Sequence, residues 1–219
     1  MVSAGQGMDP LLKRPFSLHR WLGGDFQLMY RVVGKATAIL KEKSPGERLD
    51  VIGPLGNGFQ VAENEEKMPL LVAGGIGVAP IFALAESLSR LKPEFFYGAR
   101  TGEEILCAEE LISLGINTVI STDDGTSGEK GSVIDLLNNF LSLNSRPADS
   151  YRLYACGPKP MLRSLSHLAE KYKIEGSMAL EESMACGIGS CLGCVVNTTS
   201  GYKRVCKEGP VFPIEEIVW

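Results

Sequence analysis

Hydrophobic and polar residues follow different rhythms in three parts of the chain. Up to about residue 62, short runs rich in β-branched and aromatic residues, such as 26–33 and 48–52, are separated by glycine and proline. This pattern is typical of antiparallel β structure. The polar stretch 63–67 then predicts a surface linker.

From residue 68 onward, short apolar runs alternate with helical patterns. Residues 70–73 are all apolar, as expected for a strand that is buried on both faces. The same alternation predicts further strands at 94–97, 117–121 and 151–155, and helices at 80–88, 132–141 and 160–172. Strands that alternate with helices indicate a doubly wound, parallel α/β sheet. From about residue 177 the chain returns to short strands, with a hairpin turn at 199–201.

Composition narrows the functional classes. The chain has 219 residues and a net charge of −4, which gives no support for nucleic-acid binding. No run reaches the roughly 18 apolar residues of a membrane span, and the first residues lack the pattern of a signal peptide. We therefore expect a cytoplasmic protein. In a reducing compartment, clustered cysteines indicate metal or redox chemistry rather than disulfides.

Four of the six cysteines have the spacing C-x4-C-x2-C-x11-C, at Cys186, Cys191, Cys194 and Cys206. Plant-type [2Fe–2S] clusters use a C-x4-C-x2-C loop and a fourth cysteine further along the chain. The sequence therefore predicts a two-iron cluster on these thiolates. Structural zinc and inert buried cysteines are the alternatives, although zinc usually takes paired C-x2-C units, of which only Cys191 and Cys194 form one, and inert cysteines would not share a glycine-rich loop.

The residues between these cysteines fit a cluster loop. Glycines at 187, 189 and 193 allow the backbone to wrap closely and to turn N–H groups toward the cluster. We expect the apolar side chains of Ile188, Leu192 and Val195 to keep water away from it.

Two glycine turns follow predicted strands and open predicted helices. The first is Gly74-Gly75-Ile76-Gly77-Val78-Ala79-Pro80, and the second is Cys156-Gly157-Pro158. A helix N-terminus behind such a turn suits a pyrophosphate. Asp123 and Asp124, after another strand, would repel a 2′-phosphate and so favour NAD over NADP. Ordinary turn chemistry is the alternative for each of these features.

Basic turns near the N-terminus are candidates for a flavin site. Arg14 is followed by proline, which fixes its backbone, and its guanidinium is suited to phosphate. Ser17 offers a hydroxyl to a flavin ring edge, and the 34–37 turn offers N–H groups and a lysine to a second phosphate. Taken alone, these are also plain β-turns with basic residues.

The order of motifs resembles one family along nearly the whole chain. These motifs are RPFS, YRVVGKAT, GPLGNGF, GGIGVAP, YGAR, CGPKPM, ESMACGIGSCLGCVV and YKRVCKEGPVF. Together they are similar to the electron-transfer subunits of NAD-dependent (class 1B) dihydroorotate dehydrogenases, in the ferredoxin reductase-like superfamily. The cysteine motif is the most specific to this family.

The resemblance implies cofactor roles for individual residues. It implies FAD binding by Arg14, Pro15, Phe16, Ser17, Tyr30, Arg31, Val32, Val33, Gly34, Lys35, Ala36 and Thr37. It implies NAD binding by Gly74, Gly75, Gly77, Tyr97, Ala99, Arg100, Cys156, Gly157 and Pro158. Cys156 would lie near the nicotinamide as a shaping residue, since no histidine stands out as its partner, and no catalytic residue is assigned.

The resemblance also implies an architecture. Residues 1–64 would form an antiparallel FAD-binding β-barrel, 65–176 the NAD-binding α/β domain and 177–219 the [2Fe–2S] domain. Family members usually carry further strands ahead of the segment that matches Met1, so we expect the barrel to lack its first strands.

The implied function is electron transfer in pyrimidine biosynthesis. Electrons from dihydroorotate would come from an FMN-containing catalytic subunit, in a hetero-oligomer expected to be a heterotetramer, and would pass through the cluster and FAD to NAD⁺. We expect apolar surface near Leu192, Val211, Phe212 and Trp219 to contact that subunit. The alternatives are a related subunit of a bifurcating ferredoxin:NADP⁺ oxidoreductase or a sulfide dehydrogenase, or a non-catalytic, zinc-stabilised nucleotide-binding module.

Overall fold

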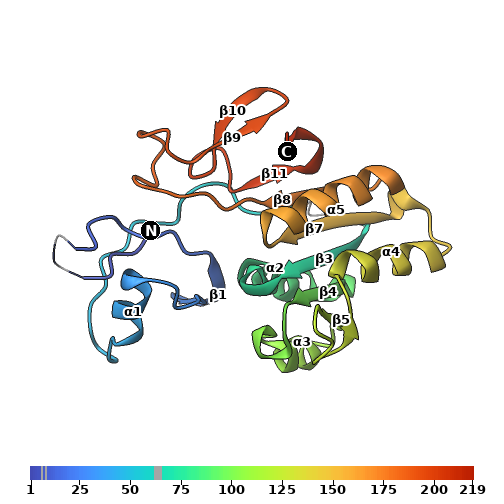
Figure 1. The fold of residues 1–219 in the computed structure, drawn as a ribbon, viewed down its shortest axis with the longest axis horizontal. Coiled ribbons are helices and arrows are strands. Elements are labelled where there is room, and N and C mark those ends of the chain that lie inside the picture. The colour runs from blue at the N-terminus through green and yellow to red at the C-terminus, as the bar shows by residue number, and fades with distance from the viewer. Residues whose placement is uncertain (6, 8, 62–65) are drawn as a thin grey trace.

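The computed structural model describes residues 1–5, 7, 9–61 and 66–219. Its N-terminal region contains strands β1 (Leu18–Leu22) and β2 (Asp25–Leu28) and helix α1 (Lys35–Lys41). The two strands form an antiparallel hairpin, and Gly23 and Gly24 at its turn both have positive φ. In Figure 1 this region lies at the left of the molecule. Most of the predicted 63–67 linker falls outside the described residues.

Regular structure in the N-terminal region is sparser than its sequence pattern indicates. The run at 48–52 forms no strand and contributes a single bridge, between Val51 and Val2. Residues 35–41, expected as part of a β region, instead form α1. Ala36 and Leu40 lie four residues apart on its buried face, where they pack with Val2 and Ala4.

The centre of the molecule is a seven-stranded sheet in the order β11-β8-β7-β3-β4-β5-β6. All neighbouring strands are parallel except β11 and β8. The strands are β3 (Met68–Gly74), β4 (Glu94–Ala99), β5 (Asn117–Thr122), β6 (Glu129–Lys130), β7 (Tyr151–Cys156), β8 (Gly176–Ala179) and β11 (Val211–Pro213). The predicted parallel α/β sheet is confirmed.

Helices cover both faces of this sheet. They are α2 (Val78–Leu88), α3 (Ala108–Ser113), α4 (Val133–Leu143) and α5 (Lys159–Tyr172). Alternate residues of β3 supply two separate cores: Leu70 and Val72 pack with α4 and α5, and Leu71 and Ala73 pack with α2 and α3. This arrangement explains why the strand is apolar at every position.

The predicted strands and helices of this region are all present, but the sequence pattern did not reveal α3, β6, β8 and β11. Helix α3 has six residues, of which only Leu111 is buried. Strand β8 reads Gly-Ser-Met-Ala, which has no β-branched residue. These elements are held by their neighbours in space rather than by a strong local pattern.

The C-terminal segment is packed against the sheet. Strands β9 (Val195–Thr198) and β10 (Gly201–Arg204) form the predicted hairpin, shown in red at the top of Figure 1. Phe212 of β11 is 2% exposed and belongs to the same core as α5. The expectation that Phe212 lies on an apolar surface is therefore wrong, because this ring closes the core beneath the hairpin. Within the described ranges, no helix is both long and apolar enough to cross a membrane.

Candidate functional site

The two predicted glycine turns meet at the carboxyl edge of the sheet. Strands β3 and β7 are neighbours, and Ala73 pairs with Cys156 where both strands end. A Cβ placed on Gly77 would lie 2.6 Å from the carbonyl carbon of Cys156 and 2.8 Å from the nitrogen of Gly157. The two backbones therefore touch, and no side chain fits between them.

Two helices begin at this contact. Helix α2 starts directly after Gly77, and α5 starts directly after Pro158. Each N-terminus presents unpaired N–H groups and the positive end of a helix dipole. Such a convergence at neighbouring strand ends is suited to the phosphates of a dinucleotide.

The buried side chain of Tyr97 is hydrogen-bonded to the first glycine turn. Its ring is fully buried, and its hydroxyl lies 3.1 Å from the carbonyl oxygen of Gly75 and accepts the N–H of Leu106 at 3.2 Å. Burial raises the pKa of Tyr97 to about 12. The structure thus places this predicted NAD contact beneath the loop, while Ala99 is half-buried and Arg100 is exposed at the end of β4.

One carboxylate joins the two predicted nucleotide sites. Glu104 accepts hydrogen bonds from the guanidinium of Arg100, with its Nε at 3.1 Å, and lies 3.4 Å from the guanidinium of Arg31. These bonds, above all the one from Arg100, lower the pKa of Glu104. Glu104 was not predicted, because an acidic residue in a short turn matches no motif.

The acidic turn at Asp123 and Asp124 lies beside these residues. Their N–H groups donate to the carbonyl oxygens of Ala99 and Arg100, at 3.1 and 3.2 Å. The Asp124 carboxylate accepts from both the hydroxyl and the N–H of Thr126, which lowers its pKa. The turn is therefore ordered next to Arg100, as a determinant of NAD selectivity would need to be.

The predicted flavin motifs run side by side. Leu18 pairs with Leu28, which brings the RPFS motif alongside the YRVV motif, and the rings of Phe16 and Tyr30 are 5.4 Å apart. Arg14 is half-buried, and its backbone pairs with Val2. A pocket of about 460 Å³ lies beside this hairpin and is lined by His19, Gln27, Leu28, Met29 and Tyr30.

The second flavin motif is mostly exposed. The side chains of residues 31–35 face solvent, whereas Ala36 and Thr37 are buried. The N–H groups of Val33 and Gly34 donate to the Thr37 hydroxyl at 3.0 and 3.2 Å. Lys35 forms an ion pair with Asp9. The Gly34 N–H, which was expected to meet a phosphate, is thus bonded to Thr37, and the exposed basic side chains of Arg31 and Lys35 pair with Glu104 and Asp9.

The four cysteines of the C-terminal motif lie together as two pairs. The thiols of Cys186 and Cys191 interact with each other, and so do those of Cys194 and Cys206. The N–H of Cys206 also points at the sulfur of Cys194, at 3.4 Å. A two-iron cluster needs four thiolates, two for each iron, and this donor set provides them. Among the described residues, no three His, Cys, Asp or Glu side chains are grouped around a single metal position.

The loop backbone favours thiolates, as its glycines predict. N–H groups of Ile188, Cys191 and Ser190 point at the sulfur of Cys186, and the one from Ile188 contributes most in lowering its pKa to about 6. Gly187 and Gly189 both have positive φ, which turns the loop inward. These residues therefore fit an iron–sulfur cluster in donor type and in hydrogen bonding.

The apolar residues of the loop do not shield it. Ile188 is 56% exposed, Leu192 60% and Val195 38%. The expectation that they keep water from the cluster is therefore wrong among the described residues, because Ile188 and Leu192 have more than half of their surface in contact with solvent. Tyr202, on the adjacent hairpin, is 79% exposed. These four exposed apolar side chains belong to the cluster loop and to the hairpin that follows it.

The cluster segment is bound to the N-terminal region. The side-chain amide of Asn57 donates to the carbonyl oxygens of Lys207 and Glu208, at 2.9 and 3.1 Å. A Cβ on Gly187 would overlap the side chain of Met1. The cluster loop therefore lies against the predicted flavin region, and Asn57, which belongs to the GPLGNGF motif, was not identified as the residue that joins them.

Arg204 makes a second connection within the cluster segment. Its guanidinium donates to the carbonyl oxygen of Gly189 at 2.8 Å and forms an ion pair with Glu208. The hydrogen bond with Glu208, and then the charges of Glu208, Cys206 and Cys194, raise the pKa of Arg204. Arg204 was also not predicted, because it lies between the third and fourth cysteines, where the cluster motif specifies no residue types.

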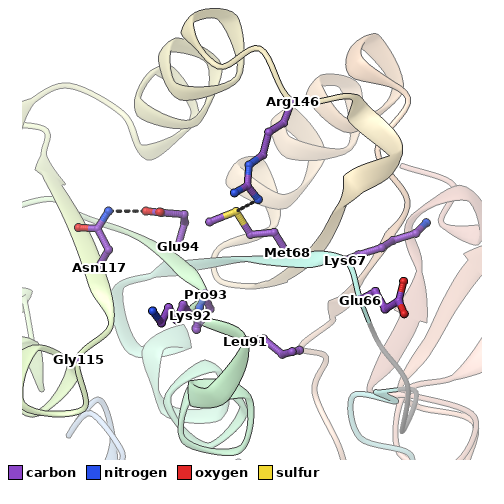
Figure 2. Close-up of a pocket in the computed structure, with 10 residues that line it drawn as sticks. All are labelled: Glu66, Lys67, Met68, Leu91, Lys92, Pro93, Glu94, Gly115, Asn117 and Arg146. Carbon is purple, nitrogen blue, oxygen red and sulfur yellow. Dashed lines mark hydrogen bonds between the residues drawn. The ribbon is translucent and has the colours of Figure 1, made fainter.

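A further pocket lies at the opposite edge of the sheet. It measures about 460 Å³ and surrounds the amino ends of β3, β4 and β5. Figure 2 shows Arg146 directed at Met68, and Asn117 bonded to Glu94, in this pocket. The predicted nucleotide residues are at the carboxyl ends of the same strands, so this pocket is not part of their site.

Comparison with known families identifies an iron–sulfur region and an NAD-binding region. Residues 181–218 match the iron–sulfur cluster binding domain of dihydroorotate dehydrogenase B, and residues 71–167 match the oxidoreductase NAD-binding domain. The chain is 38% identical to the electron transfer subunit of dihydroorotate dehydrogenase B (NAD(+)) of Desulforamulus reducens, over 100% of this chain and 84% of that protein. The subunit of Geobacillus kaustophilus is 40% identical, over 99% and 84%.

Solved structures show the same architecture. The structure of an NADH-dependent reduced ferredoxin-NADP oxidoreductase, studied for flavin-based electron bifurcation, has a TM-score of 0.75 and 30% identity, over 89% of this chain and 69% of that one. The ferredoxin reductase of carbazole 1,9a-dioxygenase has a TM-score of 0.60 and 20% identity, over 74% and 53%, and shows the fold alone. The ferredoxin reductase-like fold is therefore confirmed, and the chain belongs to the family of dihydroorotate dehydrogenase B (NAD(+)) electron transfer subunits.

Proposed function

We propose that this chain carries electrons between an FMN-containing dihydroorotate dehydrogenase catalytic subunit and NAD⁺, in pyrimidine biosynthesis. Its membership of the family and its two matching domain models support this function. When bound, a [2Fe–2S] cluster supplies one-electron transfer, and FAD supplies the exchange between single electrons and the two-electron chemistry of NAD. The chain itself shows no acid–base pair for dihydroorotate among the candidate residues, in keeping with substrate oxidation on the partner.

The observation that carries this proposal is the contact of the cluster loop with the predicted flavin region. Asn57 and Gly187 link these two regions, and Arg31 links the flavin region to Glu104 on the NAD side. These contacts support an electron path from the cluster through the flavin region to the NAD side. An electron carrier needs such a path, whereas a nucleotide-binding module does not.

The positions of the site residues support the following roles. Cys186, Cys191, Cys194 and Cys206 hold the cluster, and the glycine turns at 74–77 and 156–158 admit the NAD pyrophosphate. Arg14, Ser17 and Tyr30, together with the exposed residues 31–35, hold FAD along the pocket beside β1 and β2. Cys156 is buried, and burial raises the pKa of its thiol, which suits a shaping role rather than a nucleophile.

The exposed apolar side chains of Ile188, Leu192, Val195 and Tyr202 support a partner that covers the cluster. We place the catalytic subunit there and propose a heterotetramer, in the cytoplasm. We also propose the division into 1–64, 65–176 and 177–219. Strand β8 starts at Gly176, so the last unit shares the central sheet with the NAD unit instead of forming a separate body.

The related bifurcating oxidoreductase remains the second candidate, since its structure is 30% identical over most of this chain. Two dihydroorotate dehydrogenase B electron transfer subunits are 38% and 40% identical to this chain. The family model that matches residues 181–218 is the cluster binding domain of the same enzyme. These values favour dihydroorotate as the electron source.

Reconstitution with a catalytic subunit tests the proposal. The chain, its FMN-containing partner, dihydroorotate and NAD⁺ are mixed without oxygen, and NADH is followed at its absorbance maximum. We expect NADH to form only when both subunits are present. NADPH formation from NADP⁺ with NADH and reduced ferredoxin as donors, without NADH formation from dihydroorotate, would favour the second candidate. The absence of both reactions would reject both candidates.

A further inference from the structure

The cluster segment contains a charged pair that reaches across the cysteine motif. Arg204 ends strand β10, two residues before Cys206, and pairs across the hairpin with Val195, next to Cys194. Its NH1 group donates to the carbonyl oxygen of Gly189, which lies between Cys186 and Cys191. One guanidinium therefore connects the loop of the first three cysteines with the strand that brings in the fourth.

The other side of the guanidinium is held by Glu208. Its Nε lies 3.0 Å from the carboxylate, and the Glu208 carboxylate also accepts the N–H of Arg204 at 2.8 Å. The Arg204 carbonyl oxygen in turn accepts from the N–H groups of Lys207, Glu208 and Gly209. A guanidinium that is hydrogen-bonded on both sides cannot rotate away from the cysteine motif, which distinguishes Arg204 from a solvated surface arginine.

We propose that Arg204 is a positioning residue for the cluster that also sets its reduction potential, with Glu208 acting in the opposite direction. The inference rests on the proposed cluster site but not on dihydroorotate as electron source. Reduction adds one negative charge to the cluster, and a fixed positive charge nearby stabilises that state. Both side chains are about one-third exposed or less, at 27% and 31%, so water screens them only in part.

Opposite shifts in two variants separate this role from a structural one. Arg204→Gln removes the positive charge and leaves that of Glu208 uncompensated, so we expect the midpoint potential to fall. Glu208→Gln leaves Arg204 unpaired, so we expect it to rise. A shift of 59 mV corresponds to a tenfold change for one electron, and we expect each variant to change the equilibrium by about three- to tenfold. The double variant should return close to the original value.

The experiment is an anaerobic redox titration of the full chain, in which the electron paramagnetic resonance signal of the reduced cluster is measured at each potential. The iron and sulfide content of each variant is measured as well. Lys203→Gln is the matched control: it removes a neighbouring positive charge that pairs with Glu216 instead, and we expect a smaller shift. Opposite shifts in the two single variants support the proposal.

Three results would overturn it. These are unchanged potentials in both single variants, shifts of the same sign, or a shift in Lys203→Gln as large as in Arg204→Gln. If Arg204→Gln loses iron, Arg204→Lys decides: recovered iron supports the role of the charge, and continued loss assigns Arg204 a structural role only. Because titration uses chemical mediators, failure of dihydroorotate-driven turnover leaves this result intact.

Discussion

The Cα of Gly77 lies against the carbonyl group of Cys156, so closely that a Cβ would be 2.6 Å from the carbonyl carbon. This contact joins the two glycine turns and sets the spacing of the helix N-termini behind them. Gly77 is therefore required by its neighbour rather than by its own φ of −59°.

Gly77→Ala should disturb both the fold and the NAD site. We expect a free energy of unfolding about 1–3 kcal/mol lower, because the backbone of β7 must move. We also expect NADH affinity to fall about tenfold, or about 1.4 kcal/mol. Urea unfolding and NADH titration measure the two effects. Gly58→Ala is the control, since a Cβ there meets no atom within 4 Å; equal losses in both variants would contradict this account of the turn.

Glu104→Gln should change nucleotide binding more than stability. Glu104 competes with bound phosphates for Arg100 and Arg31, so its neutralisation should tighten NADH binding by about two- to fivefold, within the range of exposed ion pairs. The free energy of unfolding should change by less than about 1 kcal/mol. Isothermal titration with NADH measures the effect, with Glu103→Gln as the control. Weaker binding in Glu104→Gln would mean that Glu104 orients Arg100 toward the nucleotide instead.

Tyr97 should make the protein less stable at high pH. Its pKa is about 12 in the folded chain, against an ordinary value of 10.0. Between these values the unfolded chain releases a proton that the folded chain keeps, so the free energy of unfolding falls as pH rises from about 10 to 12. The loss is at most about 3 kcal/mol. Urea unfolding at pH 9 to 11 should show this slope, and Tyr97→Phe should reduce it. An unchanged slope in the variant would exclude Tyr97 as its source.

Asn57 should couple the cluster segment to the N-terminal region. Asn57→Ala removes two hydrogen bonds to the carbonyl oxygens of Lys207 and Glu208, each of which contributes about 0.5–1.5 kcal/mol. We expect a matching loss in the free energy of unfolding and slower reduction of the cluster by NADH in stopped flow. Gln60→Ala is the control, because the Gln60 amide donates to the carbonyl oxygen of Gly58, two residues away. Cluster reduction at the original rate in Asn57→Ala would show that this joint does not affect electron transfer.

The sequence predicts the central sheet well, because each strand and helix there has a strong local pattern. Strand β3 is apolar throughout since both its faces are buried. The N-terminal region is predicted poorly. Helix α1 lies in a stretch that reads as β, and residues 48–52 form a bridge instead of a strand. Both depend on contacts with residues distant in the chain.

The site residues also divide into those that the sequence predicts and those that it does not. The cysteine spacing and the glycine turns identify residues that act through their own chemistry. Glu104, Asn57 and Arg204 act through contacts across 15 to 151 positions of the sequence, or through two arginines at once, and no local pattern marks them. The exposure of Ile188 and Leu192 was also unpredictable, because a cluster loop covered by a partner and one covered by its own chain have the same apolar residues.

In the proposed function, electrons reach NAD⁺ through the four-cysteine site. Cys194→Ser in the assembled complex tests it most directly, with Cys107→Ser, a cysteine outside the motif, as the control. We expect Cys194→Ser to abolish NAD⁺ reduction by dihydroorotate while NADH still reduces ferricyanide through the flavin, and Cys107→Ser to retain both activities. Unchanged dihydroorotate-driven NAD⁺ reduction in Cys194→Ser would contradict the account.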